Sequence, residues 1–314
     1  MSTPPARSRH RSAPAAAGFA PADLLLLVAL SSMWGLSFLF IELALRDLGP
    51  LWIVTGRTVI GGALLLSVVL VRGGLPRGGG LWLRLLALGI VNNALPWAAI
   101  AWAQQRLPSG LTGLLMAIVP TTTLLVAAAV GLERITPRRL LGLLLAMAGV
   151  AVIVGGDIEQ PGRVVAVLAV VLATLGYAMG AVFAKSQLSG LAPPLAIATG
   201  QVVSAAAVTL PVAWFVEGTP QLSGLAPTTL LAMTLLGAFG TGLAFLVFYT
   251  LVARVGATNA TLTTYLIPIV AVVAGTWLLD ERLGVSAMIG GGLILVGIWL
   301  AQHVASPPRP SGDT

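Results

Sequence analysis

The chain has 314 residues, of which 57% are hydrophobic and only 9% are charged, and its mean hydropathy is +0.99. A water-soluble domain carries about 25% charged residues to keep its surface hydrated, so the composition excludes one and predicts a membrane protein. Cysteine is absent, which excludes disulfides, thiolate catalysis and cysteine-bound metals. The two histidines, His10 and His303, lie in or beside the tails, so we expect no imidazole chemistry within the membrane, no metal and no cofactor.

The net charge of +7 does not indicate a nucleic-acid partner. The basic residues stand singly or in pairs beside apolar runs rather than together on one patch, which is typical of the cytoplasmic loops of membrane proteins. Residues 1–21 are rich in Pro, Ser and Arg and have no long apolar core, so we predict a disordered cytoplasmic tail. Residues 304–314 are interpreted in the same way.

Ten apolar runs lie between the tails, and a helix of about 20 such residues crosses about 30 Å of hydrocarbon. The runs lie near residues 24–43, 51–71, 83–103, 109–131, 140–156, 164–184, 194–215, 229–250, 259–279 and 284–303. Backbone groups in lipid must be paired within the segment, so each run is predicted to be a helix. The predicted fold is an all-α integral membrane protein with ten transmembrane helices.

The distribution of basic residues predicts the orientation in a cytoplasmic membrane. With the N-terminus inside, twelve of the 17 Lys and Arg residues fall on the cytoplasmic side and one, Arg57, lies within a span. The opposite side holds the remaining four, which are Arg46, Arg106, Arg163 and Arg282. We therefore expect both termini in the cytoplasm.

The stretch PTTTLLVAAAVGLER at residues 120–134 returns as PIVAVVAGTWLLDER at 268–282, which is a shift of 148 positions. The same shift aligns further pairs without a gap: Gly89 with Gly237, Arg106 with Arg254, Pro120 with Pro268, Glu133 with Glu281, Gly142 with Gly290 and Gly149 with Gly297. Earlier, a shift of 144 aligns Thr55-Gly56-Arg57 with Thr199-Gly200-Gln201. The chain is therefore predicted to hold two five-helix repeats, residues 22–157 and 164–303.

An odd number of helices per repeat means that the second repeat enters the membrane from the opposite side. Two inverted repeats can exchange slightly different conformations, which favours alternating access over a fixed pore. The alternative is a duplication retained only for folding.

Arg57 is the one full charge placed inside a span, at a cost of about 2.5–3.5 kcal/mol on insertion scales. One interpretation is that it binds an anionic group such as a substrate carboxylate. The alternative is that it snorkels to the nearer interface. Gln201, its repeat counterpart, is a candidate for the same substrate after the conformational switch.

Other polar and aromatic residues interrupt the spans. In the first span, Trp34 and Glu42 share one face, which could bind a ligand or could instead pack against other helices or face lipid. Glu42 is the only acidic residue in any predicted span. Glu42 is therefore the candidate for proton coupling, unless it is simply an interfacial carboxylate. Asn92, Asn93 and Trp97 interrupt the third span, where they could form a polar wall or hydrogen bonds between helices.

Prolines divide the fourth and ninth spans. Pro120 and Pro268 each remove a backbone hydrogen bond and kink a helix, so we interpret them as hinges of a moving cavity lining. Threonines surround both prolines, and Tyr265 shares a face with Pro268. Tyr177 is a further candidate for substrate binding.

These features together resemble the drug/metabolite transporter superfamily, in particular its ten-helix EamA-type members. The resemblance rests on the doubled five-helix unit, Trp34-Gly35, Arg57, Pro120 and Glu133-Arg134, and it covers about residues 22–302. It implies a carrier of the cytoplasmic membrane, often an exporter of amino acids or related metabolites, with a central cavity between the halves. The second half departs from the pattern, since it has Leu175-Gly176 and Gln201 where the first has Trp-Gly and Arg.

The sequence therefore predicts a secondary transporter that exports a small metabolite, such as an amino acid or related carboxylate. Alternatives are a multidrug efflux carrier, which would use a mid-membrane glutamate that is missing here, and a channel. An enzyme is not expected, because no cluster of His, Asp, Glu or Cys lies at a common depth. The expected partners are a small-molecule substrate and the lipid bilayer, and a homodimer is left open.

Overall fold

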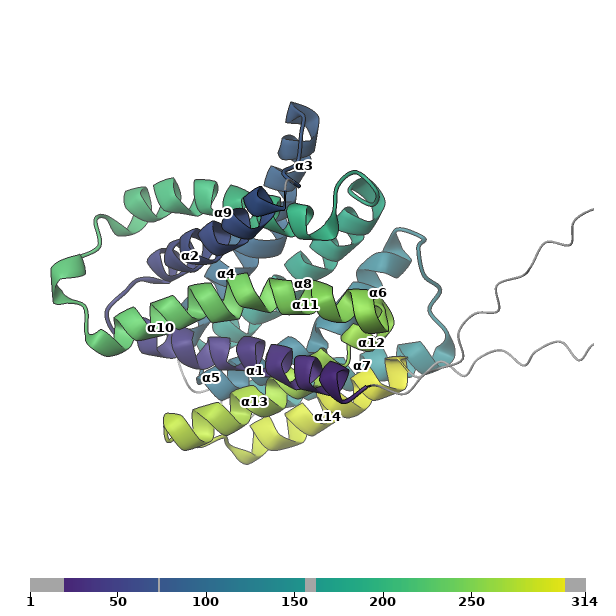
Figure 1. The fold of residues 1–314 in the computed structure, drawn as a ribbon. Coiled ribbons are helices and arrows are strands. Elements are labelled where there is room, and N and C mark those ends of the chain that lie inside the picture. The colour runs from purple at the N-terminus through teal and green to yellow at the C-terminus, as the bar shows by residue number, and fades with distance from the viewer. Residues whose placement is uncertain (1–19, 73, 156–161, 303–314) are drawn as a thin grey trace, which may run out of the picture.

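A computed structural model describes residues 20–72, 74–155 and 162–302, and these residues form helices and connecting loops without a strand (Figure 1). Within them, nine helical segments are long and apolar enough to cross a membrane, and the shorter helix Thr263–Leu278 makes a tenth candidate. The predicted all-α membrane fold is thereby confirmed. The predicted tails lie outside the described residues except for Ala20 and Pro21, and Pro21 already belongs to the first helix.

Six of the spans are single helices. They are α1 (Pro21–Ala44), α2 (Pro50–Val71), α7 (Pro137–Gly155), α8 (Arg163–Gln187), α9 (Pro194–Glu217) and α14 (Val285–Gln302). Proline occupies the first position of most of these helices, where its missing N–H has no helical partner to lose. Glycine ends α9, because Gly218 has a φ of 72° that other residues rarely adopt.

The other four spans are composite. The third consists of α3 (Gly79–Gly89), a π-helical turn (Ile90–Ala94) and α4 (Leu95–Gln104), and the fourth consists of α5 (Ser109–Leu115), a 3₁₀ turn (Met116–Ile118) and α6 (Val119–Ala129). The eighth consists of α10 (Pro227–Gly237), a π-helical turn (Ala238–Leu243) and α11 (Ala244–Val255). The ninth consists of α12 (Ala257–Ala260) and α13 (Thr263–Leu278). A short 3₁₀ turn, Leu222–Gly224, lies between α9 and α10. Each composite span therefore changes its helical register within the membrane.

The two π-helical turns occupy equivalent positions, because residues 90–94 become 238–242 after a shift of 148. In the first turn, Pro96 would clash with the carbonyl of Asn92 in a regular helix, and the wider turn avoids this contact. The second turn contains no proline. There, Gly240 approaches Ser37 of α1 so closely that an added Cβ would lie 2.6 Å from its hydroxyl oxygen. The repeat therefore preserves the turn although the local sequences differ.

The ninth span differs from the single helix expected over residues 259–279, because it breaks at Thr261 and Leu262. The hydroxyls of Thr263 and Thr264 bond back to the carbonyls of Ala260 and Thr261, at 2.8 and 2.6 Å. Such side-chain bonds compete with the helical ladder for the same carbonyls. Hydrophobicity alone did not reveal the break.

The two halves pack on each other reciprocally. Helix α2 contacts α9 and α7 contacts α14, while α1 packs on α13 and α8 packs on α6 (Figure 1). Backbones approach closely between α7 and α14, where a Cβ on Gly149 would lie 2.5 Å from the carbonyl oxygen of Gly290. The second and fifth spans of one half thus meet their counterparts in the other half. The first span of each half meets the fourth span of the other, so the contacts follow the symmetry of the repeat.

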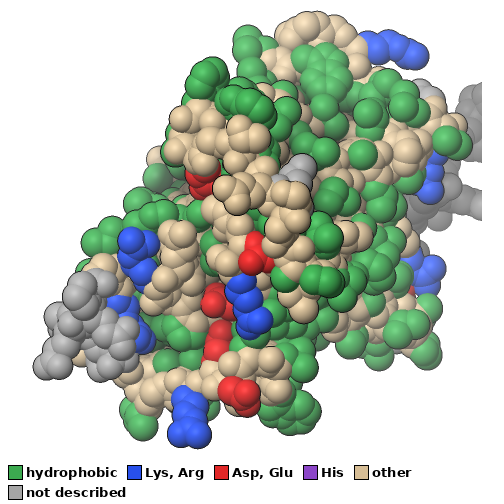
Figure 2. Space-filling view, turned by 90° about the vertical axis from the view of Figure 1, so that its left-hand side faces the viewer, with side chains coloured by type: hydrophobic (Ala, Val, Ile, Leu, Met, Phe, Trp, Pro, Cys, Tyr) green, Lys and Arg blue, Asp and Glu red, His purple; other side chains and the backbone are tan. Residues whose placement is uncertain are grey.

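The bundle has two chemically different ends. We call the end with Arg84, Arg139, Lys185 and Arg254 the basic end; the described ends of α1 and α14 lie on this side (Figure 1). The other is called the acidic end, and its carboxylates include Asp47, Glu217 and Glu281. Acidic side chains are seen near the middle of this face (Figure 2).

Candidate functional site

A buried cation lies between the two halves of the bundle. The side chain of Arg57 in α2 is only 7% exposed. Its Nε donates a hydrogen bond to the hydroxyl of Thr241 at 2.8 Å, and its Nη2 donates to the carbonyl of Gly240 at 3.3 Å. Its guanidinium carbon lies 3.9 Å from the centre of the Trp97 ring. No carboxylate among the described residues lies within ion-pair distance of Arg57, so the charge is solvated by neutral groups only.

Tyr177 of α8 belongs to the same cluster. It packs against the core that contains Trp97, and it is close enough to Arg57 to interact with it electrostatically. The structure thus brings together three predicted site residues from three different helices. A guanidinium, an indole and a phenol around one point can bind an anionic group and a neighbouring apolar or aromatic group.

A second polar contact occupies the equivalent place in the other repeat. The amide Nδ2 of Asn92 donates to Oε1 of Gln201 at 3.2 Å, and Gln201 is 4% exposed. After the shift of 148, Asn92 and Asn93 correspond to Gly240 and Thr241, the partners of Arg57. Asn93 is 1% exposed, and its Oδ1 has no hydrogen-bond partner among the described residues. Each repeat therefore links its second helix to the π-helical turn of the other.

The roles of Gly240 and Thr241 were not foreseen from the sequence. Neither residue stands out in a run that reads AFGTGL. The repeat did carry a usable signal, since shifting the conspicuous pair of asparagines by 148 positions leads directly to them.

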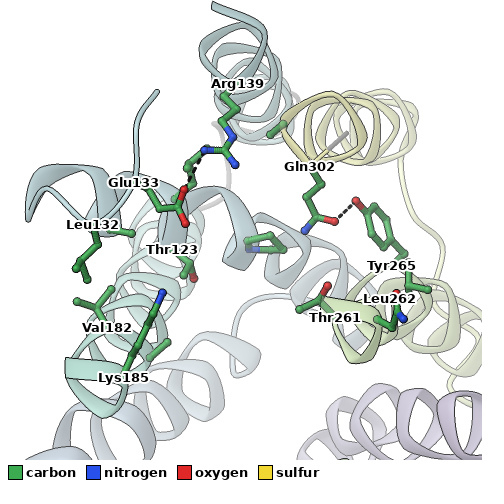
Figure 3. A pocket seen from close by; sticks show the side chains of 16 residues that line it. Thr123, Leu132, Glu133, Arg139, Val182, Lys185, Thr261, Leu262, Tyr265 and Gln302 are labelled. Atoms are coloured by element: carbon green, nitrogen blue, oxygen red, sulfur yellow. Dashed lines mark hydrogen bonds and ion pairs between the residues drawn. The ribbon is translucent and has the colours of Figure 1, made fainter. Parts of the chain in front are cut away.

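A cavity of about 560 Å³ opens at the basic end. One wall carries Thr123, Glu133 and Lys185, and the facing wall carries Tyr265 and Gln302 (Figure 3). The Tyr265 hydroxyl hydrogen-bonds to Oε1 of Gln302, from α13 to α14. The lining comprises Pro120, Thr123, Leu124, Ala127, Leu132, Glu133, Arg139, Ala181, Val182, Lys185, Asn259, Thr261, Leu262, Tyr265, Ala301 and Gln302.

The predicted site residues do not all meet in one place. Only Pro120 and Tyr265 line the cavity at the basic end. Pro268 is buried inside α13. Trp34 lies apart from the Arg57 cluster and packs against Phe248, with ring centres 5.5 Å apart. Lys185, Asn259 and Gln302 add polar groups to the cavity, and sequence reasoning had overlooked them because they lie near the ends of spans.

At the acidic end, carboxylates accept hydrogen bonds from the starts of helices of the other half. Glu281 accepts from the backbone N–H groups of Ser109 and Gly110, at 2.7 and 2.9 Å, where α5 begins. Glu217 accepts from Leu51 and Trp52, at 2.9 and 3.2 Å, near the start of α2. Because helix N-termini carry partial positive charge, each contact is favourable to the carboxylate.

Asp47 makes a third contact of this kind, at the start of α10. It accepts a hydrogen bond from the hydroxyl of Thr229 at 2.5 Å and another from the N–H of Ala226 at 2.9 Å. These two bonds lower the pKa of the Asp47 carboxyl below its ordinary value of 3.8. Carboxylates at this end are visible among arginine side chains near the middle of the face (Figure 2).

The basic end has fewer contacts of this kind. Arg254 pairs with Asp23 at 2.5 Å, which joins the end of α11 to the start of α1. Glu133, the repeat counterpart of Glu281, pairs with Arg139 at 3.1 Å on the wall of the open cavity. Both ends therefore have carboxylate contacts between the halves, and the 560 Å³ cavity lies at the basic end.

Ten membrane helices in two inverted halves, with a buried polar centre and a cavity entered from one end, define a multi-pass membrane transporter. The chain belongs to the EamA-like transporter family, which matches residues 22–155 and 164–302. This confirms the resemblance to the drug/metabolite transporters.

Several relatives of the chain carry transporter names. An uncharacterized transporter of Archaeoglobus fulgidus is 26% identical over 86% of this chain and 94% of its own length. A probable amino-acid metabolite efflux pump of Escherichia coli is also 26% identical, over 88% of this chain and 94% of its own length. A probable terminal-alkyne amino-acid exporter of Streptantibioticus cattleyicolor is 29% identical, over 68% of this chain and 70% of its own length.

A solved crystal structure has the same fold. It superposes with a TM-score of 0.63 at 20% sequence identity, and the match covers 89% of this chain and 96% of that chain. At this identity, the likeness concerns the fold alone.

Proposed function

We propose that the protein is a secondary transporter that exports a small carboxylate-bearing metabolite, such as an amino acid, by alternating access. The observation that carries the proposal is the buried guanidinium of Arg57, which has no acidic partner among the described residues. An unpaired buried charge costs several kcal/mol, so its presence needs a compensating partner for part of the cycle. A substrate carboxylate supplies that charge and fits the planar fork of the guanidinium. Two relatives named for amino-acid export support this substrate class.

The orientation follows from the positive-inside rule. The basic end faces the cytoplasm, so the described conformation is open to the cytoplasm through the 560 Å³ cavity and closed at the opposite side. A substrate made inside the cell enters this cavity first, where Lys185 adds a positive charge beyond the Arg139–Glu133 ion pair. Both termini then lie in the cytoplasm, in the cytoplasmic membrane.

The inverted repeat suggests the contact that closes the cavity. Glu281 closes the acidic end by accepting from the N–H groups of residues 109 and 110. With the repeat shift of 148, the counterpart of Glu281 is Glu133. The counterparts of residues 109 and 110 are residues 257 and 258, at the start of α12. In the opposite conformation, Glu133 leaves Arg139 and its carboxylate meets these backbone N–H groups, while Glu281 releases α5.

The two closures are not identical in detail. Gly275 and Gly110 leave room for the Glu281 carboxylate, since an added Cβ would lie 2.2 Å and 3.1 Å from its Oε2. Position 127, which corresponds to 275, is alanine, and position 258, which corresponds to 110, is threonine. Glu133 therefore needs a shifted side-chain position, and Arg139 competes for it. This asymmetry favours the conformation that is open at the basic end.

The test compares metabolites inside and outside cells that produce the parent chain, Arg57→Ala or Arg72→Ala. Arg72 is the matched control, because it is an exposed arginine just beyond the end of the same helix. We expect one carboxylate-bearing metabolite to accumulate outside with the parent and with Arg72→Ala, and not with Arg57→Ala at equal membrane abundance. Undiminished export by Arg57→Ala would remove Arg57 from the substrate site. Export of a compound without a carboxylate would refute the proposed substrate class.

A further inference from the structure

A second, smaller pocket of about 300 Å³ lies at the acidic end. It is lined by Glu42, Leu45, Arg46, Gln104 and Gln105. Acidic and basic side chains lie close together on this face of the molecule (Figure 2). Glu42 comes from the last turn of α1, and Gln104 is the last residue of α4. The pocket is therefore formed where two spans end side by side.

Two oxygen atoms at this pocket lack hydrogen-bond donors. Oε2 of Glu42 and Oε1 of Gln104 are both buried and have no partner among the described residues. The Gln104 side chain is only 3% exposed, and its Nε2 donates to the carbonyl of Phe38 at 2.9 Å. Rotating the amide by 180° would bring two acceptors together, so Oε1 is fixed as an acceptor. The Gln104 amide acts on the Glu42 carboxyl, and a further donor or a positive charge would pair the two remaining oxygens.

A proton on the Glu42 carboxyl meets this requirement without any further ligand. A protonated carboxyl has an O–H donor and no net charge, so it suits a site with a second acceptor nearby. The hard metal cations Ca²⁺ and Mg²⁺ take six or more oxygen ligands, and this pocket offers the side-chain oxygens of only three residues, Glu42, Gln104 and Gln105, beside the cationic Arg46. The charged groups that face Glu42 are Glu281 and Arg46. Gln105 on the remaining side is neutral.

The pocket adjoins the contact that closes the acidic end. Gln104 is followed by residues 105–108 and then by Ser109, whose N–H is bound by Glu281. Glu281 also acts electrostatically on Glu42, as noted above. When Glu42 loses its proton, two carboxylates repel one another across this short connection, and the hold of Glu281 on α5 weakens.

We propose that Glu42 binds a proton from the acidic side and that this protonation stabilises the closed contact between Glu281 and α5. Gln104 acts as the positioning residue that holds the carboxyl of Glu42. The inference adds to the proposed function an external proton site that controls the closing of the outer end, and it rests on that function only for the orientation in the membrane.

The experiment measures opening of the acidic end without any substrate. The chain has no cysteine, so Ser109→Cys gives a single thiol at a position that is fully buried here. Cells with this variant are treated with a membrane-impermeant maleimide at external pH values of about 8 and about 5.5, the second of which is closer to the ordinary carboxyl range. The rate is divided by that of Gln221→Cys, an exposed thiol at the same end, to remove the effect of pH on thiol reactivity.

We expect the normalised rate to fall by about five- to tenfold at the lower pH, which is a typical strength for coupling between sites. Glu42→Gln mimics the protonated carboxyl and should give the slow rate at both pH values. Glu42→Asp retains a carboxyl and should recover part of the pH dependence, whereas Asp47→Asn should leave that dependence unchanged.

Two results would overturn the inference. One is an unchanged pH response in Glu42→Gln. The other is a rate that follows external sodium at constant pH, which would assign the pocket to a metal cation. Since labelling needs no substrate, a normal pH response in a chain that exports nothing would count against the proposed function alone.

Discussion

The contact of Glu281 with the start of α5 should set the balance between the two conformations. Glu281→Ala removes two hydrogen bonds from a carboxylate to backbone N–H groups, of 2.7 and 2.9 Å. A hydrogen bond to a charged group contributes about 1.5–3 kcal/mol. Because Glu281 is half-buried, we take the lower value for each bond, which gives about 3 kcal/mol in total. At 1.4 kcal/mol for each factor of ten, the equilibrium shifts toward opening of the acidic end by about 100-fold.

The shift can be followed from both sides of the membrane with single thiols. Ser109→Cys reports opening of the acidic end, and Thr123→Cys reports access to the cavity at the basic end. With Glu281→Ala, labelling of the first from outside should accelerate, and labelling of the second in inside-out vesicles should slow. Both rates saturate once the open state dominates, so the measured change is a lower bound on the shift.

The matched control is Asp280→Asn, which removes the adjacent charge. Asp280 is exposed and has a φ of 55°, a left-handed conformation that asparagine also adopts. Its labelling rates should equal those of the parent. Two hydrogen bonds to a charged group should shift the labelling rates by far more than about twofold. Rates in Glu281→Ala within about twofold of the parent would therefore refute the assignment of this contact as the closure.

Three further predictions concern the centre, the acidic end and the packing of the halves. Arg57→Lys keeps the charge but loses the planar fork, so the KM for a carboxylate substrate should rise by about tenfold in a vesicle uptake assay; an unchanged KM would mean that the fork does not bind substrate. The lowered pKa of Asp47 makes its contribution to stability present above pH 3.8 and lost as the pH falls through the lower value of the folded protein. The melting temperature should therefore fall less with decreasing pH in Asp47→Asn than in the parent. An equal fall in both proteins would show that the Asp47 contacts do not lower its pKa. Gly149→Val places a side chain where a Cβ would already lie 2.5 Å from the carbonyl oxygen of Gly290, so unfolding in detergent should require about 1–3 kcal/mol less; a melting temperature equal to that of the parent would show that α7 and α14 separate easily.

Much of the fold could be predicted because membrane insertion is decided locally. The scarcity of charge in ten successive stretches of about 20 residues is enough to require helices across lipid. The repeated glycines at 142, 149, 290 and 297 marked the repeat, and the structure places them where α7 meets α14. Helix count, class and repeat thus follow from residues that are near one another in the chain or related by one shift.

The breaks inside spans were harder to predict. Asn92 and Pro96 pointed to an interruption of the third span, but the π-helical turn of the eighth span contains neither residue type. The break at Thr261 depends on hydroxyls that bond to the backbone, and hydropathy does not detect it. Backbone register within a span depends on which neighbouring helix it must accommodate.

The sequence by itself determined that this chain spans a membrane ten times, repeats a five-helix unit and carries one charge within a span, because each follows from the cost of placing polar groups in lipid. Only the tertiary structure decided that Arg57 meets Thr241 and Gly240 rather than a carboxylate, and that the 560 Å³ cavity lies at the basic end. These facts depend on distances between residues up to 184 positions apart, which are set by the packing of helices from opposite halves. Hydropathy fixes where the helices cross the membrane, whereas the packing of their side chains fixes which residues meet.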